Sequence, residues 1–326
     1  MNSGEPDYRA LVTITTCRRL DRVRRYLPHF AQFCDSDSRF SLLLALDGTD
    51  EAYEQFCEEW SLPLVYSAET EGVGLSKNRV LERFPDFDYY FFLDDDVELT
   101  DSLVFPAHIR LAQESRIHHL SLFERDGMRT PTRETTVGDF RVAHGMFGGG
   151  QFNFFTGAGL KRVGGWHTDF AAFRRWGHTE HSYRFFHAGL TPAPFNMAIG
   201  LADTCIWHYP PPVTKAGGMA IDQDQISAVE RRLMDARLDY FPVTTLSVHR
   251  FNRQPFAQID RLAGLVGPRE RYPLASRAER RQALADYSLW KARTSTGRLT
   301  RLNHLVRAAA HWPNNPRLRH QIKTGR

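Results

Sequence analysis

The segment DYYFFLDDDVEL, residues 88–99, joins an unbroken apolar and aromatic run to three consecutive carboxylates, Asp94, Asp95 and Asp96. A short continuous run of this kind predicts a strand buried on both faces, as in a parallel α/β sheet. Open α/β sheets bind ligands at the carboxyl ends of their strands, which is where these acids stand. Adjacent carboxylates repel one another unless a cation neutralises them, and hard divalent ions prefer oxygen ligands. The segment therefore predicts a Mg²⁺ or Mn²⁺ site at the end of a central strand.

The neighbouring segments favour this interpretation over a plain acidic turn or a helix N-terminus, where aspartate is also favourable. We expect strands at 10–16, 40–46 and 63–67 and helices at 18–33, 50–60 and about 72–84. This alternation predicts βαβ units and a mainly parallel sheet with helices on both faces. Beyond the acids we expect a helix to about 115, strands at 117–123, 140–144 and about 201–209, and a polar loop at 124–138.

The composition, 42% hydrophobic and 25% charged, is that of an ordinary globular protein. No stretch approaches 18 apolar residues and the first ten residues lack a signal-peptide core, so we expect neither a membrane span nor a leader. The four cysteines form no CxxC pair, which predicts reduced thiols and a cytoplasmic location.

The charge is divided unevenly along the chain. Residues 251–326 carry 16 Lys and Arg against 4 Asp and Glu, a net of +12, whereas the remainder carries 26 against 34, a net of −8. Helices are expected at 276–293 and 298–312, and the second has an apolar stripe edged by Arg301 and Arg307. Such a helix either lies on an anionic membrane surface or packs its stripe on the rest of the protein. Nucleic acid is not an expected partner, because no recognition motif accompanies the basic residues.

A glycine pair at Gly72 and Gly74 precedes Lys77 and Arg79 at an expected helix start. The third glycine of a dinucleotide fingerprint would fall at Lys77, so that motif fails. The two cations beside a helix N-terminus predict an anion site, with an ordinary surface helix as the alternative.

Residues 148–155 combine a glycine run with three aromatics, and residues 156–190 alternate aromatic rings with charged and titratable groups. Sugar rings stack on aromatic side chains and need polar partners for their hydroxyls, so this mixture suits a carbohydrate. Trp166 and Trp176 are the candidate stacking residues, and the alternative is that these rings belong to the core.

Taken in order, Thr15-Thr16 after the first strand, Asp47-Gly48, GVGLSKNR at 72–79, LDDD at 93–96 and GGW at 164–166 resemble a GT-A fold nucleotide-sugar glycosyltransferase of the family 2 type. The resemblance covers roughly residues 10–210. It implies a GT-A domain at 1–245, with a nucleotide-binding half at about 8–123 and an acceptor half at about 136–210. The basic helical extension is then 246–326.

The resemblance assigns roles to individual residues of this chain. Thr15 and Asp47 would hold the base and ribose of the nucleotide, and Lys77 would lie near it. Asp94 and Asp95 would contact the donor, whereas Asp94 and Asp96 would bind the metal. His208 resembles a late histidine that completes the metal shell, with a core histidine as the alternative.

The chain departs from the family where the catalytic base is expected. Anchoring the family spacing on Arg184 and Gly189 puts His178 in the slot of the usual acid, with Glu180 two residues later. Both a carboxylate and a neutral imidazole can take a proton from an acceptor hydroxyl near neutral pH. We favour Glu180 because it is a carboxylate, and His178 and the adjacent His181 remain candidates. Glu180 and Trp166 would also contact the acceptor.

The implied function is metal-dependent transfer of a hexosyl or N-acetylhexosaminyl group, with inversion, from a UDP-sugar to a carbohydrate, lipid-linked or other hydroxyl acceptor. The setting would be bacterial polysaccharide or glycoconjugate synthesis, in the cytoplasm or on the inner face of the membrane. A sugar nucleotidyltransferase is an alternative, but its Gly-rich loop is missing after the first strand. An inactive sugar-nucleotide-binding module is another. Residues 214–222, with a Gly-Gly pair, are a candidate lid over the donor.

Overall fold

The computed structural model describes residues 8–122, 133–145, 148–166, 177–201, 204–208 and 297–311, with a few isolated positions between 285 and 322. The helices are α1 (Leu20–Ser36), α2 (Glu51–Glu59), α3 (Val73–Arg83), α4 (Val104–Ser115), α5 (Gly157–Val163), α6 (His178–His187) and α11 (Arg298–His311). The strands are β1 (Ala10–Thr16), β2 (Phe40–Leu46), β3 (Leu64–Tyr66), β4 (Tyr89–Asp94), β5 (Val97–Leu99), β6 (His119–Leu122), β7 (Arg133–Val137), β8 (Phe140–Gly145), β9 (Phe152–Thr156), β10 (Phe195–Ala198) and β11 (Cys205–Trp207).

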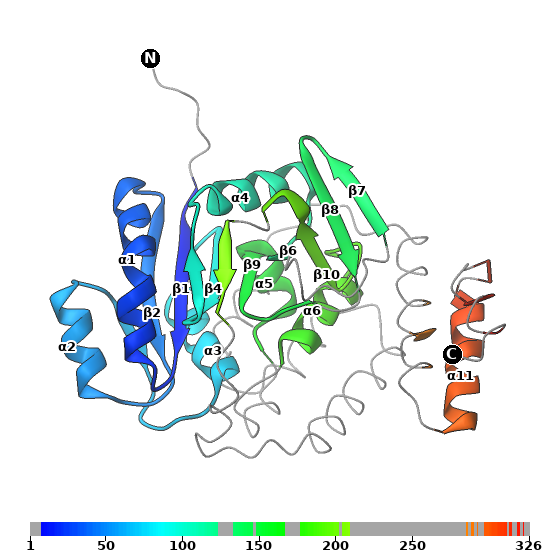
Figure 1. Cartoon of the computed structure of the whole chain (residues 1–326), viewed down its shortest axis with the longest axis horizontal. Helices are drawn as coiled ribbons and strands as arrows, with labels where there is room; N and C mark the ends of the chain where they lie inside the picture. The colour runs from blue at the N-terminus through cyan, green and yellow to red at the C-terminus, as the bar shows by residue number, and fades with distance from the viewer. Residues whose placement is uncertain are drawn as a thin grey trace.

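Nine of the eleven described strands form one sheet, in the order β3-β2-β1-β4-β9-β6-β10-β8-β7 (Figure 1). Strands β3, β2, β1 and β4 are all parallel, whereas β9 and β8 run against their neighbours. The mixed α/β sheet, parallel through its N-terminal half, confirms the predicted fold class. Strand β5 pairs separately with β11, as an antiparallel two-stranded sheet.

The prediction for the second half of the sheet needs correction at two strands. The predicted loop at 124–138 includes strand β7 among its described residues. The segment from 152 to 156, which the sequence marked only as aromatics after a glycine run, is strand β9, buried along its whole length and inserted between β4 and β6. Its aromatic rings therefore belong to the core.

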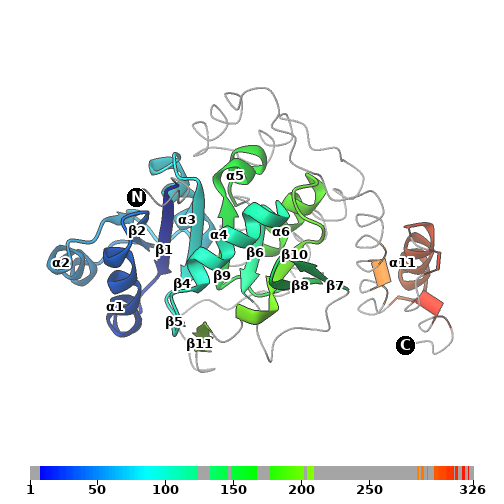
Figure 2. The ribbon, with the colours of Figure 1, turned by 90° about the horizontal axis from the view of Figure 1, so that it is seen from above.

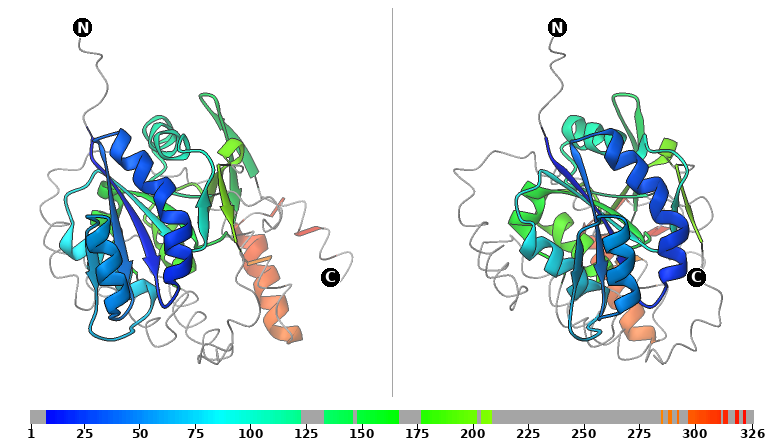
Figure 3. Two further views of the ribbon diagram at one scale, coloured as in Figure 1. Left: turned by 60° about the vertical axis from the view of Figure 1, so that its left-hand side comes forward. Right: turned by 90° about the vertical axis from the view of Figure 1, so that its left-hand side faces the viewer.

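Alternate side chains of the central strands enter two different cores, which explains why these strands are apolar without a break. Val12, Phe91 and Leu93 pack with α1, α2 and α4 on one face. Leu11 and Phe92 pack with α3, α5 and α6 on the other. Figures 2 and 3 show helices on both sides of the sheet, with α1 lying along the N-terminal strands.

The parallel register brings the predicted motifs to one edge of the sheet. Thr15 lies beside Ala45 of β2 on one side and beside Asp94 of β4 on the other. Asp47 directly follows β2 and the acidic turn follows β4, so both lie at the same carboxyl edge. Residues more than 75 positions apart in the chain are thereby gathered into one site.

Helix α11 contributes Ala308 to a small apolar cluster with Leu289 and Leu318. Among the residues that the structure describes, no helix combines the length and the hydropathy needed to cross a membrane. All four cysteines are free thiols, as their spacing predicted.

Candidate functional site

The acidic turn, Asp94 to Asp96, connects β4 to β5. Asp94 accepts a hydrogen bond from Thr15 Oγ1 at 3.0 Å and lies 3.3 Å from Lys77 Nζ. Thr15 also donates to the Leu93 carbonyl and is 3% exposed. Thr15 therefore orients Asp94, and the nucleotide-binding role predicted for it does not fit its buried hydroxyl.

Asp95 points into the protein. Thr16 donates to its Oδ2 at 2.7 Å, and Arg19 Nη2 lies 2.7 Å from its Oδ1. Burial raises the pKa of Asp95 to about 7, although Arg19 opposes that shift. Because both oxygens are engaged within the protein, Asp95 holds α1 to the turn, and the predicted donor contact does not fit.

Asp96 has one oxygen engaged and one unpaired. Its Oδ2 accepts from Arg19 at 3.1 Å and lies 3.7 Å from Arg22 Nη1. Its Oδ1 is buried without a hydrogen-bond partner among the described residues. Burial, followed by the charge of Asp94, raises the pKa of the Asp96 carboxyl. A buried, unpaired carboxylate oxygen beside an open strand end is a suitable ligand for a hard divalent cation.

His208 reaches the same turn through its backbone, because its N–H donates to the Asp96 carbonyl at 2.8 Å. Its ring stacks on Tyr26, and Nε2 lies 2.6 Å from Glu98 Oε2. In the described part of the chain, no three His, Cys, Asp or Glu side chains form a metal-binding group. The predicted trio of Asp94, Asp96 and His208 is therefore adjacent but not assembled around one point. The residues present fit a cation held by one or two carboxylates and completed by substrate phosphate oxygens, a common arrangement for Mg²⁺.

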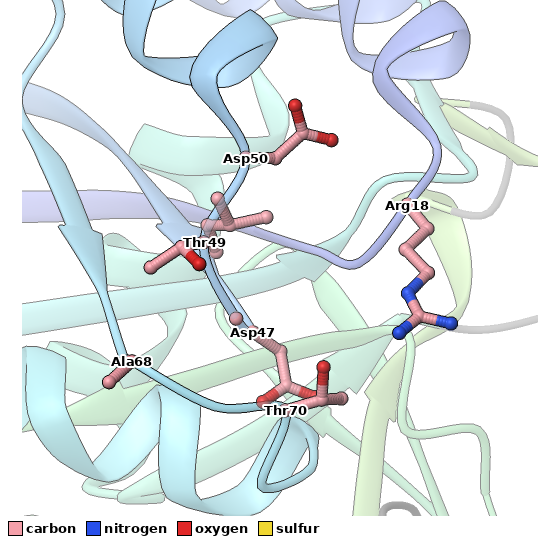
Figure 4. A pocket seen from close by; sticks show the side chains of 8 residues that line it. Arg18, Asp47, Thr49, Asp50, Ala68 and Thr70 are labelled. Carbon is pink, nitrogen blue, oxygen red and sulfur yellow. The ribbon is translucent and has the colours of Figure 1, made fainter.

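A pocket of about 250 Å³ lies at the carboxyl end of β2. Figure 4 shows Arg18 on one side and Asp47 and Thr70 together on the other. The pocket is lined by Arg18, Leu46, Asp47, Gly48, Thr49, Asp50, Ala68 and Thr70.

Asp47 holds in place the segment that follows β3, part of which lines this pocket. Its carboxylate accepts the backbone N–H groups of Glu71 and Gly72 at 2.7 to 2.9 Å, just before α3. Gly48 has a φ of 109°, and a Cβ there would meet the Thr70 hydroxyl at 3.0 Å, so glycine is required. Asp47 thus lines a pocket with carboxylate, hydroxyl and guanidinium groups around it.

Lys77 is 3% exposed and its Nζ lies 5.5 Å from the centre of the Trp166 ring. Trp166 is 2% exposed, packs against Phe92 and exchanges two backbone hydrogen bonds with the Asn78 side chain. Trp166 is therefore a core residue beneath Lys77, and the predicted stacking on an acceptor sugar does not fit. Trp176 and the candidate lid at 214–222 lie outside the described residues.

The three candidate bases are at different places around α6. His178 begins the helix and packs against Gly150, where a Cβ would meet its ring at 2.6 Å. The charges of Lys77 and Asp94 both act on the His178 ring. Burial and then Lys77 lower its pKa to about 4, so the imidazole is neutral at pH 7. His178 thus packs on Gly150, next to Gln151, whose carbonyl accepts the Asp94 N–H at 2.8 Å.

Glu180 and His181 face the core instead. Glu180 Oε1 lies 3.0 Å from Arg184 Nε, and Arg184 Nη2 donates to Oε2 at 3.0 Å. The Glu180 side chain is fully buried. His181 Nε2 lies 2.8 Å from the Gly164 carbonyl, and its ring packs on Trp166. Among the described residues, both groups are therefore enclosed by core partners.

Sequence reasoning missed three arginines of the site. Arg18 has a φ of 55°, uncommon for a non-glycine residue, and its side chain lines the pocket. Arg19, the N-cap residue of α1, and Arg22, in its first turn, project toward Asp96. The sequence does contain a signal for two of them. Arg18 and Arg19 are consecutive and come just after a buried strand, at the edge of the sheet where α/β proteins bind ligands.

Comparison with protein-family models and with curated proteins finds no match. Solved structures give clear similarities at low sequence identity. A crystal structure of S. aureus TarS 1–349 in complex with UDP-GlcNAc is 15% identical, with a TM-score of 0.52 over 98% of this chain and 92% of that one. The mannosyltransferase PcManGT from Pyrobaculum calidifontis, in complex with GDP-Man and Mn²⁺, is 13% identical, with a TM-score of 0.50 over 98% and 81%. At such low identities the similarity is evidence about the fold alone. From it we conclude that this chain has the GT-A fold.

Proposed function

We propose that this chain is a metal-dependent glycosyltransferase that moves a sugar from a nucleotide-sugar to an acceptor hydroxyl with inversion. The observation that carries the proposal is the convergence at one sheet edge of the pocket at Asp47, the unpaired oxygen of Asp96 and the imidazole of His178. The GT-A fold supports it. A pyrimidine nucleotide, as in a UDP-sugar, is our preferred donor, and the transferred group is a hexosyl or N-acetylhexosaminyl group.

Each side chain has a role in this proposal. Arg18, Asp47 and Thr70 bind the nucleoside in the pocket. Lys77 lies against Asp94, so its ammonium group can approach the diphosphate. A divalent cation bound at Asp96 would neutralise charge on the leaving diphosphate.

We propose His178 as the base, in place of Glu180. The His178 ring has a hydrogen bond to the Gly148 backbone, and in its neutral form at pH 7 the imidazole can take the acceptor proton. Glu180 is already paired with Arg184 inside the core. His178→Asn should therefore reduce transfer by about 10²–10⁴-fold, the usual range for general-base catalysis, without weakening nucleotide binding.

The test is a screen of UDP-, GDP- and TDP-sugars with Mn²⁺, with or without candidate hydroxyl acceptors, that measures release of the nucleoside diphosphate. Metal-dependent release from one donor class supports the proposal. Release of pyrophosphate from a sugar phosphate and a nucleoside triphosphate would indicate a nucleotidyltransferase instead. Binding of UDP without any turnover across the screen would indicate an inactive binding module.

We also propose a peripheral contact between α11 and an anionic membrane surface. Leu299, Leu302 and Val306 are 83%, 58% and 59% exposed and repeat at helical spacing. Arg298 and Arg307 stand on either side of this stripe, and α11 contains no acidic residue. Sedimentation with phosphatidylglycerol vesicles should carry the protein down, and Leu299→Glu should release it. Equal sedimentation with purely zwitterionic vesicles would contradict the charge part of the argument.

A further inference from the structure

We propose that the acidic turn is neutralised by this chain's own cations, so that it binds a divalent metal only together with a nucleoside diphosphate. The inference rests on the proposed function and adds the order in which metal and nucleotide bind. The free protein would hold metal weakly, and the metal would arrive with the nucleotide or after it.

The first observation is the charge balance of the turn. Lys77 lies 3.3 Å from Asp94, and Arg19 lies 2.7 Å from Asp95. Asp96 has two cationic neighbours, Arg19 at 3.1 Å and Arg22 at 3.7 Å. The three carboxylates are therefore matched by three cationic side chains, a formal net charge of zero among these described groups.

The second observation is burial, which determines how strongly these charges act on an incoming ion. Asp95, Asp96 and Lys77 are 2%, 5% and 3% exposed. Charges this poorly solvated are screened far less than surface charges. Arg19 and Arg22 would repel a divalent cation at Asp96 across a few ångströms, which an unneutralised acidic triplet would not do.

The third observation is the number of oxygen ligands that the turn still offers. Both oxygens of Asp95 are engaged by Thr16 and Arg19, and one oxygen of Asp94 is engaged by Thr15 and Lys77. Among the described residues, two oxygens of the turn are buried without a hydrogen bond, Asp95 Oδ1 and Asp96 Oδ1. Asp95 Oδ1 is ion-paired with Arg19, so Asp96 Oδ1 is the one of the two that also lacks a cationic partner among the described residues. A hexacoordinate ion at that oxygen needs most of its ligands from elsewhere.

A nucleoside diphosphate supplies both missing contributions. Its phosphate oxygens complete the coordination shell, and its negative charge offsets the positive field of Arg19 and Arg22. The same two arginines can pair with phosphate oxygens, because guanidinium groups bind phosphate well. Metal and nucleotide should therefore bind with positive coupling, and the coupling must be equal in both directions.

The experiment is a Mn²⁺ titration of the full chain followed by electron paramagnetic resonance, alone and with saturating UDP or GDP. We expect Mn²⁺ to bind at least about tenfold more tightly with nucleotide. Arg19→Met should strengthen nucleotide-free Mn²⁺ binding by at least about tenfold, since one charge near a divalent ion matters this much even with the screening of bulk water.

Arg22→Met should strengthen nucleotide-free binding in the same direction. It leaves the Asp95 ion pair intact, so it tests the proposal even where Arg19→Met impairs folding. Arg25→Met is the matched control: it removes the same charge from an exposed residue of α1 that, in the described structure, makes no ion pair with Asp94, Asp95 or Asp96. Circular dichroism checks that each variant is folded.

Tight Mn²⁺ binding by the nucleotide-free protein would overturn the inference and leave the proposed function standing. Arg19 and Arg22 variants that bind Mn²⁺ no better than the Arg25 variant would also overturn it. Failure to bind UDP or GDP under any condition would overturn the proposed function itself. Tight UDP binding that never recruits Mn²⁺ would mean that Arg19 and Arg22 replace the metal, which also refutes the inference.

Discussion

Replacing Glu180 by glutamine removes one charge of a buried ion pair. Glu180 is fully buried and Arg184 is 4% exposed, and the two make contacts of 3.0 Å. Removing one partner of such a pair costs roughly 3–5 kcal/mol, because the other charge stays buried without compensation. Arg184 also donates to the carbonyls of Val163 and Gly165, which places the expected cost near the lower end, about 3 kcal/mol. In a domain of this size that corresponds to a melting temperature lower by about 6–12 °C.

The assay is thermal unfolding of Glu180→Gln beside sugar transfer measured well below the melting temperature. We expect the large loss of stability and only a modest loss of transfer in the folded fraction. The double variant Glu180→Gln with Arg184→Met should recover part of the stability, because an apolar side chain replaces the unpaired charge. His178→Asn should show the opposite pattern, with normal melting and little transfer. A Glu180→Gln enzyme that melts normally but transfers sugar 10²-fold more slowly would refute this reasoning and make Glu180 the base.

Three further predictions concern the metal ligand, the pocket and the buried histidines. Asp96→Ala should abolish Mn²⁺-dependent transfer while circular dichroism stays unchanged, and full transfer in excess EDTA would contradict the metal role. Asp47→Ala leaves the backbone N–H groups before α3 without their acceptor, so calorimetry should show UDP binding weaker by about tenfold and melting should fall, each lost charged hydrogen bond costing roughly 1.5–3 kcal/mol. Burial lowers the pKa of His108 and of His119 to about 4, below the ordinary 6.5. Their contribution to stability is therefore complete above pH 6.5 and is lost as the pH falls toward 4, by on the order of 2 kcal/mol each at pH 5, and acid melts of His119→Gln should show a shallower loss than the parent protein.

The parallel half of the sheet could be predicted from sequence because burial on both faces leaves a strong signal. Strands β1 and β2 begin and end where the apolar runs predicted. Asp47 and the acidic turn each follow a predicted strand, and the parallel register brings them to one edge of the sheet. Periodicity and strand order were sufficient for this part.

The second half of the sheet was harder to predict because its strands are antiparallel or short. Strand β9 follows three glycines and continues directly into α5, so its aromatic residues resemble a ligand-binding segment as much as a strand. Strand β7 is polar and only partly buried, as expected for the edge of a sheet, and it lacks an apolar pattern. Side-chain partners such as Arg19 and Asp95 depend on contacts between residues far apart in the chain, which no local pattern encodes.

The choice among the candidate bases shows where a sequence argument could have gone further. Residues four positions apart share a helix face, so the sequence already predicted an ion pair between Glu180 and Arg184 if this segment is helical. His178 is two residues before Glu180, and two residues turn an α-helix by about 200°, so these side chains point in nearly opposite directions. Since the Glu180 face is buried against α5, the His178 face is the one directed toward the glycine run, whose neighbour Gln151 is hydrogen-bonded to the acidic turn. The helical spacing of Glu180 and Arg184 is therefore itself a reason to look for the base at His178.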